Sequence, residues 1–212
     1  MSRTTLFEYR AWPSQEMPHI EALHHLFGLG VSEIRTDTYI FSPTRPSWLI
    51  VLHGATACEI LQKTGEDGPL SAWVVLTHSE YPLRRSLVRA LQGAFPMAQL
   101  PQRILVPGDV ISWLDREAVT FTVSKRTVQF QREGCVAEFT EIDAHGRRAQ
   151  TFSLTSKRQD IVLDALAMLP TPRLPNLDYG AWLQRLRRNT PARQPVVSYP
   201  GKLILGTAQV AY

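Results

Sequence analysis

The sequence has few cysteines and no long hydrophobic run. Its 212 residues include two cysteines, Cys58 and Cys135, too few for the disulfide framework of a small secreted domain. Both fall in apolar segments, so we expect two small buried thiols. No stretch approaches the roughly 18 consecutive apolar residues of a membrane-spanning helix. The opening residues, MSRTTLFEYRAWP, carry an early acid and lack the apolar core of a secretory signal, so we expect a cytoplasmic protein.

Acidic residues are missing from the last part of the sequence. None follows Asp178, whereas five basic residues do: Arg185, Arg187, Arg188, Arg193 and Lys202. The formal net charge of +4 is therefore concentrated there, and the rest of the chain is close to neutral. This distribution argues against a nucleic-acid platform that covers the whole domain. The basic segment alone is a weak RNA-binding candidate, because its only nearby aromatic residues are Tyr199 and Tyr212.

Alternation of apolar and polar residues, which is typical of strands, runs through most of the chain. It predicts strands near 5–12, 32–41, 47–53, 56–62, 71–81, 118–131, 135–143 and 148–156. Helical spacing of apolar residues predicts helices near 15–27, 83–94, 107–117, 157–168 and 178–188. Antiparallel strands in two blocks, each followed by a helix, indicate an α+β domain. About eight strands leave fewer exposed edges when they close, so we predict an antiparallel β-barrel, or tunnel, with helices packed outside.

The same alternation predicts which charged side chains face the inside of the barrel. In segment 135–143 the apolar positions suit the outer face under the helices, which turns Glu138 inward together with Thr140. Glu8 and Arg10 share one face of the first strand. A buried charge is costly unless it is paired, metal-bound or in water, so the interior has to be wet or filled by a ligand. Glu8 and Arg10 fit either a barrel-lining ion pair or a pair of ligand contacts.

Five segments, taken in order, resemble the CYTH superfamily, the triphosphate tunnel metalloenzymes that include class IV adenylyl cyclases and thiamine triphosphatases. They are FEYRAW (7–12), TDTYIFSP (36–43), CEIL (58–61), VSKRTVQFQREGCVAEFTEIDAHGRR (123–148) and LPNLDYGAWL (174–183). No single segment is specific, but the ordered set spans about residues 5–188. The resemblance implies one tunnel domain over residues 1–188, followed by a basic, proline-containing tail at 189–212.

The resemblance also implies a site. In that family, acidic residues hold Mg²⁺ or Mn²⁺, and basic residues clamp a triphosphate and stabilise the charge that moves during phosphoryl transfer. Carried over, it assigns Glu8, Glu59 and Glu138 to the metal and Arg10, Lys125 and Arg126 to phosphate. Neighbours in a strand face opposite sides, so only one of Lys125 and Arg126 points inward. Glu141 is a further carboxylate that fits the pattern less directly.

The sequence departs from the family pattern at several positions. Leu6 replaces the first glutamate of the opening strand, and Leu61 replaces a lysine. The neutral residues at further charged positions of the family are Ile50, Leu52, Gln150 and Phe152. Aliphatic side chains inside a tunnel would dry and fill part of it. This pattern indicates a depleted active site.

Other polar residues have plainer interpretations. The six histidines show no spacing that assembles a zinc site, so we interpret them as structural or solvent-exposed. Asp37 and Tyr39 are interpreted as residues of strand and barrel packing.

Two functions of different classes follow. The first is a catalytically degenerate tunnel protein that acts as a binding or scaffold subunit, with no cofactor assigned and with a protein partner docked on residues 190–212. The second is a triphosphatase that uses Mg²⁺ or Mn²⁺ to act on a small triphosphate or polyphosphate. Binding of such an anion without hydrolysis is a third option.

Overall fold

The computed structural model describes residues 4–13, 19–96, 103–114, 118–169 and 174–189. Within them the strands are β1 (Thr4–Ala11), β2 (Val31–Ser42), β3 (Arg45–His53), β4 (Ala57–Asp67), β5 (Leu70–Glu80), β6 (Val119–Arg132), β7 (Cys135–Ala144) and β8 (Arg147–Ser156). The helices in the same described ranges are α1 (His19–Phe27), α2 (Arg85–Ala94), α3 (Pro107–Leu114), α4 (Gln159–Met168) and α5 (Tyr179–Asn189). Every strand and helix predicted from the sequence corresponds to one of these elements.

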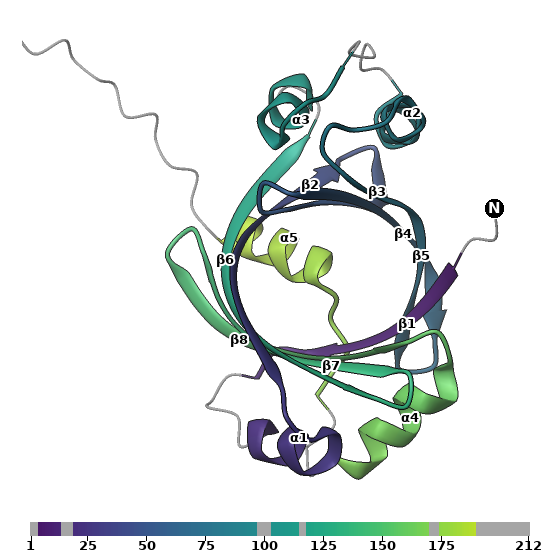
Figure 1. Cartoon of the computed structure of the whole chain (residues 1–212), viewed down its shortest axis with the longest axis vertical. Helices are drawn as coiled ribbons and strands as arrows, with labels where there is room; N and C mark the ends of the chain where they lie inside the picture. Colours follow the sequence, from purple (N-terminus) through teal and green to yellow (C-terminus); the bar gives the residue numbers. More distant parts are fainter. Residues whose placement is uncertain (1–3, 14–18, 97–102, 115–117, 170–173, 190–212) are drawn as a thin grey trace, which may run out of the picture.

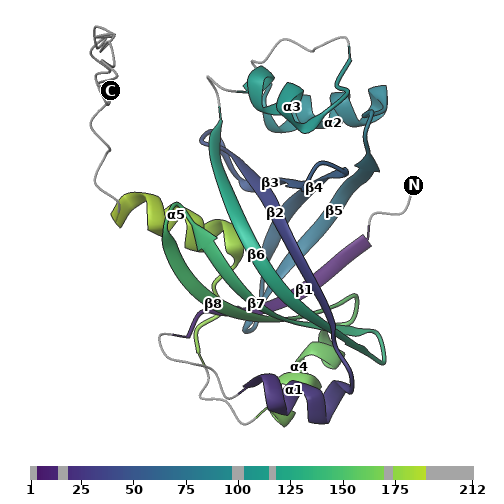
Figure 2. The same cartoon turned by 60° about the vertical axis from the view of Figure 1, so that its left-hand side comes forward.

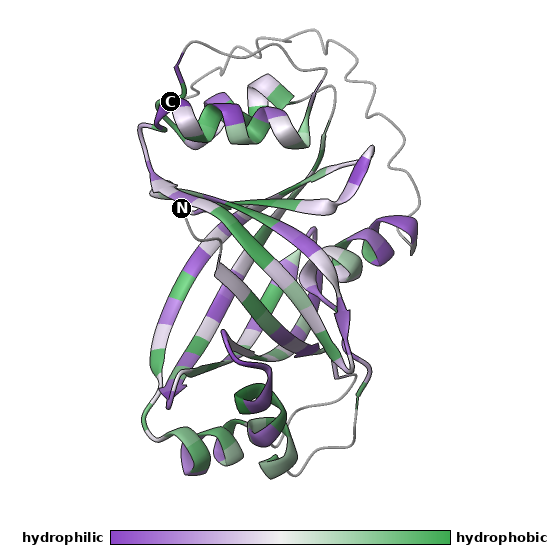
Figure 3. Cartoon of the chain, turned by 90° about the vertical axis from the view of Figure 1, so that its right-hand side faces the viewer, coloured by the Kyte–Doolittle hydropathy of each residue, from purple (hydrophilic) through white to green (hydrophobic). Residues whose placement is uncertain are grey.

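The eight strands form one closed antiparallel barrel, in the order β1-β5-β4-β3-β2-β6-β7-β8 (Figure 1). Closure comes from the pairing of β8 with β1, in which Glu8 lies opposite Thr155. Bands of hydrophilic and hydrophobic residues alternate along the strands (Figure 3), as expected when one face of a sheet packs under helices and the other faces a lumen. The predicted α+β fold, a barrel of about eight strands with helices outside, is confirmed.

Two pairs of helices cover the outer surface at opposite ends of the molecule (Figure 2). Under α2 and α3, Ile50 and Leu52 of β3 join Leu91 in one buried cluster. Under α1 and α4, Phe152 of β8 joins Val162 in another. Full burial of such side chains contributes roughly 1.5–3 kcal/mol each, so both outer clusters hold the barrel in shape.

The fifth helix, α5, lies across one end of the barrel (Figure 1). Its residues Tyr179 and Leu183 pack against Tyr39 and Phe121, in a third buried cluster made of inward-facing side chains. The ring of Tyr39 stacks on that of Tyr179 with centroids 4.7 Å apart. The helix therefore caps the lumen at this end.

The segment before α5 fixes the position of the helix against β1. The amide of Leu177 donates to the carbonyl of Arg10 at 2.8 Å, and the indole of Trp12 donates to the carbonyl of Leu177 at 2.6 Å. Trp12 also stacks on Trp182 of α5 at 4.1 Å. Asp178 caps the helix, because its Oδ1 accepts from the amide of Ala181 at 2.8 Å.

The structure also bears on the expectations about the cysteines, membrane-spanning helices and the domain boundary. Cys58 and Cys135 are free and buried, as predicted. Among the described residues no helix has the length and apolar character that crossing a membrane requires. The barrel and its helices run from Thr4 to Asn189, and the domain boundary near 188 stays a prediction. Residues 190–212, with the predicted partner segment, lie outside the described residues.

Candidate functional site

The barrel encloses a cavity of about 470 Å³. Apolar side chains form part of its wall, namely Leu6, Leu49, Val51, Leu61 and Trp73. Charged side chains form another part, namely Glu8, Arg10, Glu33, Arg35, Glu59, Lys125 and Glu138. The lumen therefore has an aliphatic part as well as an ionic part, which differs from the strongly charged tunnel that the resemblance implies.

The aliphatic part of the wall is not made by all the residues expected from the sequence. Leu61 faces the cavity as expected, but Ile50 and Leu52 point outward under α2 and α3, and Leu49 and Val51 take the inner face. Strand β3 is apolar on both faces because helices cover one and the other is the aliphatic wall. Such a strand shows no alternation from which its orientation could be read.

The structure brings five of the six predicted site residues to the cavity: Glu8, Arg10, Glu59, Lys125 and Glu138. Arg126 lies on the outer side of the barrel, exposed and opposite Glu141 of β7. Glu141 is exposed as well. Of the two neighbours, Lys125 points into the cavity and Arg126 points outward. The roles of all six residues stay predictions.

Arg10 sits between two of the predicted metal ligands. Its Nε donates to Oε1 of Glu8 at 2.7 Å, and an Nη atom lies 3.8 Å from Oε2 of Glu138. The guanidinium also lies over the ring of Tyr179, 4.8 Å from its centroid. Burial lowers the pKa of Arg10, but the charges of Glu8 and Glu138 outweigh it, so the pKa is raised and the group stays charged. The Glu8–Arg10 pair is thus a barrel-lining ion pair.

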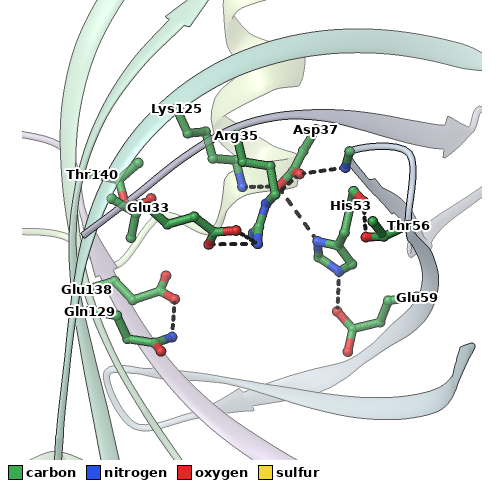
Figure 4. Close-up of polar contacts among 12 residues, drawn as sticks. Glu33, Arg35, Asp37, His53, Thr56, Glu59, Lys125, Gln129, Glu138 and Thr140 are labelled. Atoms are coloured by element: carbon green, nitrogen blue, oxygen red, sulfur yellow. Dashed lines mark hydrogen bonds and ion pairs between the residues drawn. The ribbon is translucent and has the colours of Figure 1, made fainter. Parts of the chain in front are cut away.

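Asp37 is the centre of a second ionic cluster, shown in Figure 4. Its side chain is fully buried and forms ion pairs with Nζ of Lys125 at 2.5 Å and with Nε of Arg35 at 2.7 Å. The amide of Gly54 donates to its Oδ1 at 3.2 Å, and Nδ1 of His53 lies 3.7 Å from its Oδ2. Burial would raise the pKa of Asp37, but the contact with His53 and the charges of Lys125 and Arg35 lower it well below 3.8. Interpreting Asp37 as a packing residue missed this role.

A third group joins strands β3, β4 and β5. Nε2 of His53 lies 3.2 Å from Oε2 of Glu59, and one ligand atom from each of His53, Glu59 and His78 lies within 4.8 Å of the other two. Interpretation of the histidines from their spacing missed this group, because the three residues meet only through strand pairing. The signal available in the sequence was limited to a histidine in each of two predicted strands.

The predicted metal ligands do not gather at one point. Glu8 and Glu138 both face Arg10, whereas Glu59 faces His53. An ion bound by Glu8 and Glu138 would have to share its space with the Arg10 guanidinium, and Mg²⁺ and Mn²⁺ need several oxygen ligands in regular geometry. These residues therefore do not fit a Mg²⁺ or Mn²⁺ site as they stand.

The charge balance of the lumen is acidic. Among the described residues that line the cavity, Glu8, Glu33, Glu59 and Glu138 face three basic side chains, Arg10, Arg35 and Lys125. Asp37 adds a further carboxylate behind them. Each of these basic side chains already pairs with a carboxylate. A polyanion would have to compete with those pairs inside a cavity that carries net negative charge.

Comparison with known proteins gives the fold. No protein-family model matches the chain, and no curated protein matches it. The structure is similar to that of a candidate adenylate cyclase from Bacillus halodurans, with a TM-score of 0.51 and 10% identity over 87% of this chain and 98% of that one. The chain therefore shares the fold of that structure, and its closed antiparallel barrel agrees with the fold that the resemblance implied.

Two further solved structures are similar with TM-scores below 0.5. A candidate adenylyl cyclase from Hippeastrum, described as having a dominant triphosphatase activity, matches with a TM-score of 0.41 and 9% identity over 76% of this chain and 84% of that one. The PH1012 protein of Pyrococcus horikoshii matches with a TM-score of 0.47 and 14% identity over 80% and 96%.

Proposed function

We propose that this chain is a non-hydrolytic binding protein built on the tunnel fold. The observation that carries the proposal is the pairing of Arg10, Arg35 and Lys125 with carboxylates of the same lumen. A triphosphatase needs basic groups that are free to hold the phosphates and carboxylates that are free to hold the metal. Here each basic group already pairs with a carboxylate.

The wall of the cavity suits a ligand of mixed character. Leu49, Val51 and Leu61 offer an aliphatic surface, while Thr127 and Thr140 offer hydroxyl groups. A cavity of about 470 Å³ is of the size that holds a small molecule. The ligand we propose is a small amphipathic molecule with an apolar part against β3 and β4 and a polar end toward β6 and β7.

A phosphate-release assay tests the absence of hydrolysis. The full chain is incubated with ATP, tripolyphosphate or a longer polyphosphate, with Mg²⁺ and then with Mn²⁺. We expect release no faster than that of the Glu138→Gln variant, because the lumen holds no free set of metal ligands. A rate that depends on the metal and disappears in Glu138→Gln would overturn the proposal.

The binding half of the proposal has its own test. A fluorescent apolar probe such as anilinonaphthalene sulfonate should bind the chain, and Val51→Asp should weaken that binding several-fold by placing a charge in the aliphatic wall. Val106→Asp, at an exposed position just before α3 and outside the cavity-lining set, is the control and should leave probe binding unchanged. Equal binding by all three proteins would contradict a ligand site in the lumen.

A metal-dependent triphosphatase is the second candidate. What favours it is the presence of Glu8, Arg10, Lys125 and Glu138 around one cavity, the residue types that the resemblance implies for this activity. It requires Arg10 to leave Glu8 and Glu138 when a metal-bound triphosphate arrives. The assay above separates the two candidates.

Two further features belong to the proposal. A cytoplasmic location fits the free thiols of Cys58 and Cys135, since a reducing compartment keeps such cysteines unpaired. A protein partner for residues 190–212 fits the apolar run KLILG. Deleting residues 190–212 should release such a partner and leave thermal stability almost unchanged.

A further inference from the structure

Three side chains at one side of the barrel have the chemistry of transition-metal ligands. His53 ends β3, Glu59 lies in β4 and His78 lies in β5. Their ligand atoms lie within 4.8 Å of one another. Among the described residues, these three side chains are close enough together to hold a metal ion. His53 and Glu59 also line the cavity.

Strand pairing explains why the three side chains meet. Glu59 lies directly opposite His78 in the pairing of β4 with β5, and Ala57 lies opposite His53 in the pairing of β3 with β4. The β4–β5 pairing shifts register between Ile60 and Leu61. Such a bulge changes the face to which the following side chains point, and here it places His78 beside Glu59.

The distance between His53 and Glu59 suits a four-coordinate ion. Ligands bound at the usual 2.0–2.1 Å in tetrahedral geometry stand about 3.3 Å apart, and Nε2 of His53 lies 3.2 Å from Oε2 of Glu59. His78 is exposed, so its side chain is free to adjust toward the other two. Its ligand atom lies within 4.8 Å of theirs, so His78 has to move closer when the ion binds.

A carboxylate behind the first histidine supports the same interpretation. Nδ1 of His53 is buried, makes no hydrogen bond and lies 3.7 Å from Oδ2 of the fully buried Asp37. Histidines that bind metals commonly direct their second ring nitrogen to a carboxylate, which orients the ring and fixes its tautomer. With Nδ1 turned to Asp37, Nε2 of His53 is left to face Glu59 and the cavity (Figure 4).

We propose that His53, Glu59 and His78 bind one Zn²⁺-like transition-metal ion, with a fourth position open to water or to a ligand in the lumen. Two imidazoles and one carboxylate are a donor set that Zn²⁺ accepts readily, whereas Mg²⁺ and Ca²⁺ prefer oxygen ligands. The site is distinct from the cluster of Glu8, Arg10 and Glu138. It does not depend on the proposed binding function.

Equilibrium dialysis of the untagged, metal-stripped chain against Zn²⁺ tests the proposal, with the bound metal measured by mass spectrometry. We expect one Zn²⁺ per chain, unaffected by a large excess of Mg²⁺. His78→Ala and Glu59→Gln should each weaken binding at least tenfold. His25→Ala, which removes an exposed histidine of α1, is the matched control and should leave binding unchanged.

Each remaining outcome counts against the site. No Zn²⁺ bound by the unmodified chain would overturn it. Binding that persists in His78→Ala and Glu59→Gln, or that falls equally in His25→Ala, would show an adventitious ion only. His78 and Glu59, the two substituted residues, are at least partly exposed. The melting temperatures of the metal-free variants check that each has folded.

Discussion

At the scale of single residues, the fully buried carboxylate of Asp37 is the centre of the ionic contacts beside the lumen. Asp37 holds Lys125 and Arg35 in place and receives the amide of Gly54. From the sequence it was one acid in a predicted strand, and it was interpreted as a residue of strand and barrel packing. Those partners come from β6, from the turn after β3 and from its own strand, so the pairing of β2 with its two neighbouring strands brings them together.

Replacing Asp37 tests this organisation. Asp37→Asn should lower the free energy of unfolding by about 3 kcal/mol, because it leaves the mostly buried Lys125 without its counter-charge. Glu33→Gln removes an exposed partner of Arg35 and should change stability by less than about 1 kcal/mol. Urea unfolding with a chelator present measures both, and equal effects would contradict a central role for Asp37.

The pH dependence of the same variant follows from the lowered pKa of Asp37. A carboxyl whose pKa is lower in the folded state stabilises the fold above its ordinary pKa of 3.8 and loses that effect as the pH falls through the lowered value. The difference in melting temperature between the unmodified chain and Asp37→Asn should therefore shrink between about pH 5 and about pH 2. A constant difference would mean that the charge of Asp37 does not contribute.

At the scale of secondary structure, alternation was informative only where one face of a strand is polar. It correctly placed Glu8, Arg10 and Glu138 in the lumen. It could not orient β3, where Leu49 and Leu52 lie on opposite faces that are both buried. The bulge in β4–β5 that aligns His78 with Glu59 leaves no mark in the sequence either.

The cap of α5 offers a test at this scale. Asp178 accepts from the amide of Ala181 and from Lys63 at 2.8 Å. Asp178→Asn keeps a capping oxygen and loses the charge, whereas Asp178→Ala loses both. We expect the alanine variant to be less stable than the asparagine variant by about 1 kcal/mol, measured by thermal unfolding. Equal stability would show that the cap does not hold α5 over the barrel.

At the scale of the whole molecule, the order of strands and helices was enough to predict a closed barrel. How the charged side chains pair inside the barrel was not predictable from the sequence. The replacements at Leu6 and Leu61 did indicate a loss of charge. The pairing of the remaining charges with each other depends on distances across the lumen, which strand patterns do not contain. The acidic balance of the cavity therefore emerged only from the structure.

The central claim is that Arg10, Arg35 and Lys125 form ion pairs with carboxylates of the same protein and are therefore not free to bind an anion. Calorimetric titration of Mg²⁺ and tripolyphosphate into the unmodified chain and into Glu8→Gln tests it. The substitution should strengthen anion binding if Glu8 pairs with Arg10, and weaken it if Glu8 is a metal ligand. If Glu8 neutralises Arg10, the unmodified chain shows no saturable binding, and Glu8→Gln binds the anion more tightly. Saturable, Mg²⁺-dependent binding by the unmodified chain that Glu8→Gln abolishes would contradict the claim and establish Glu8 as a metal ligand.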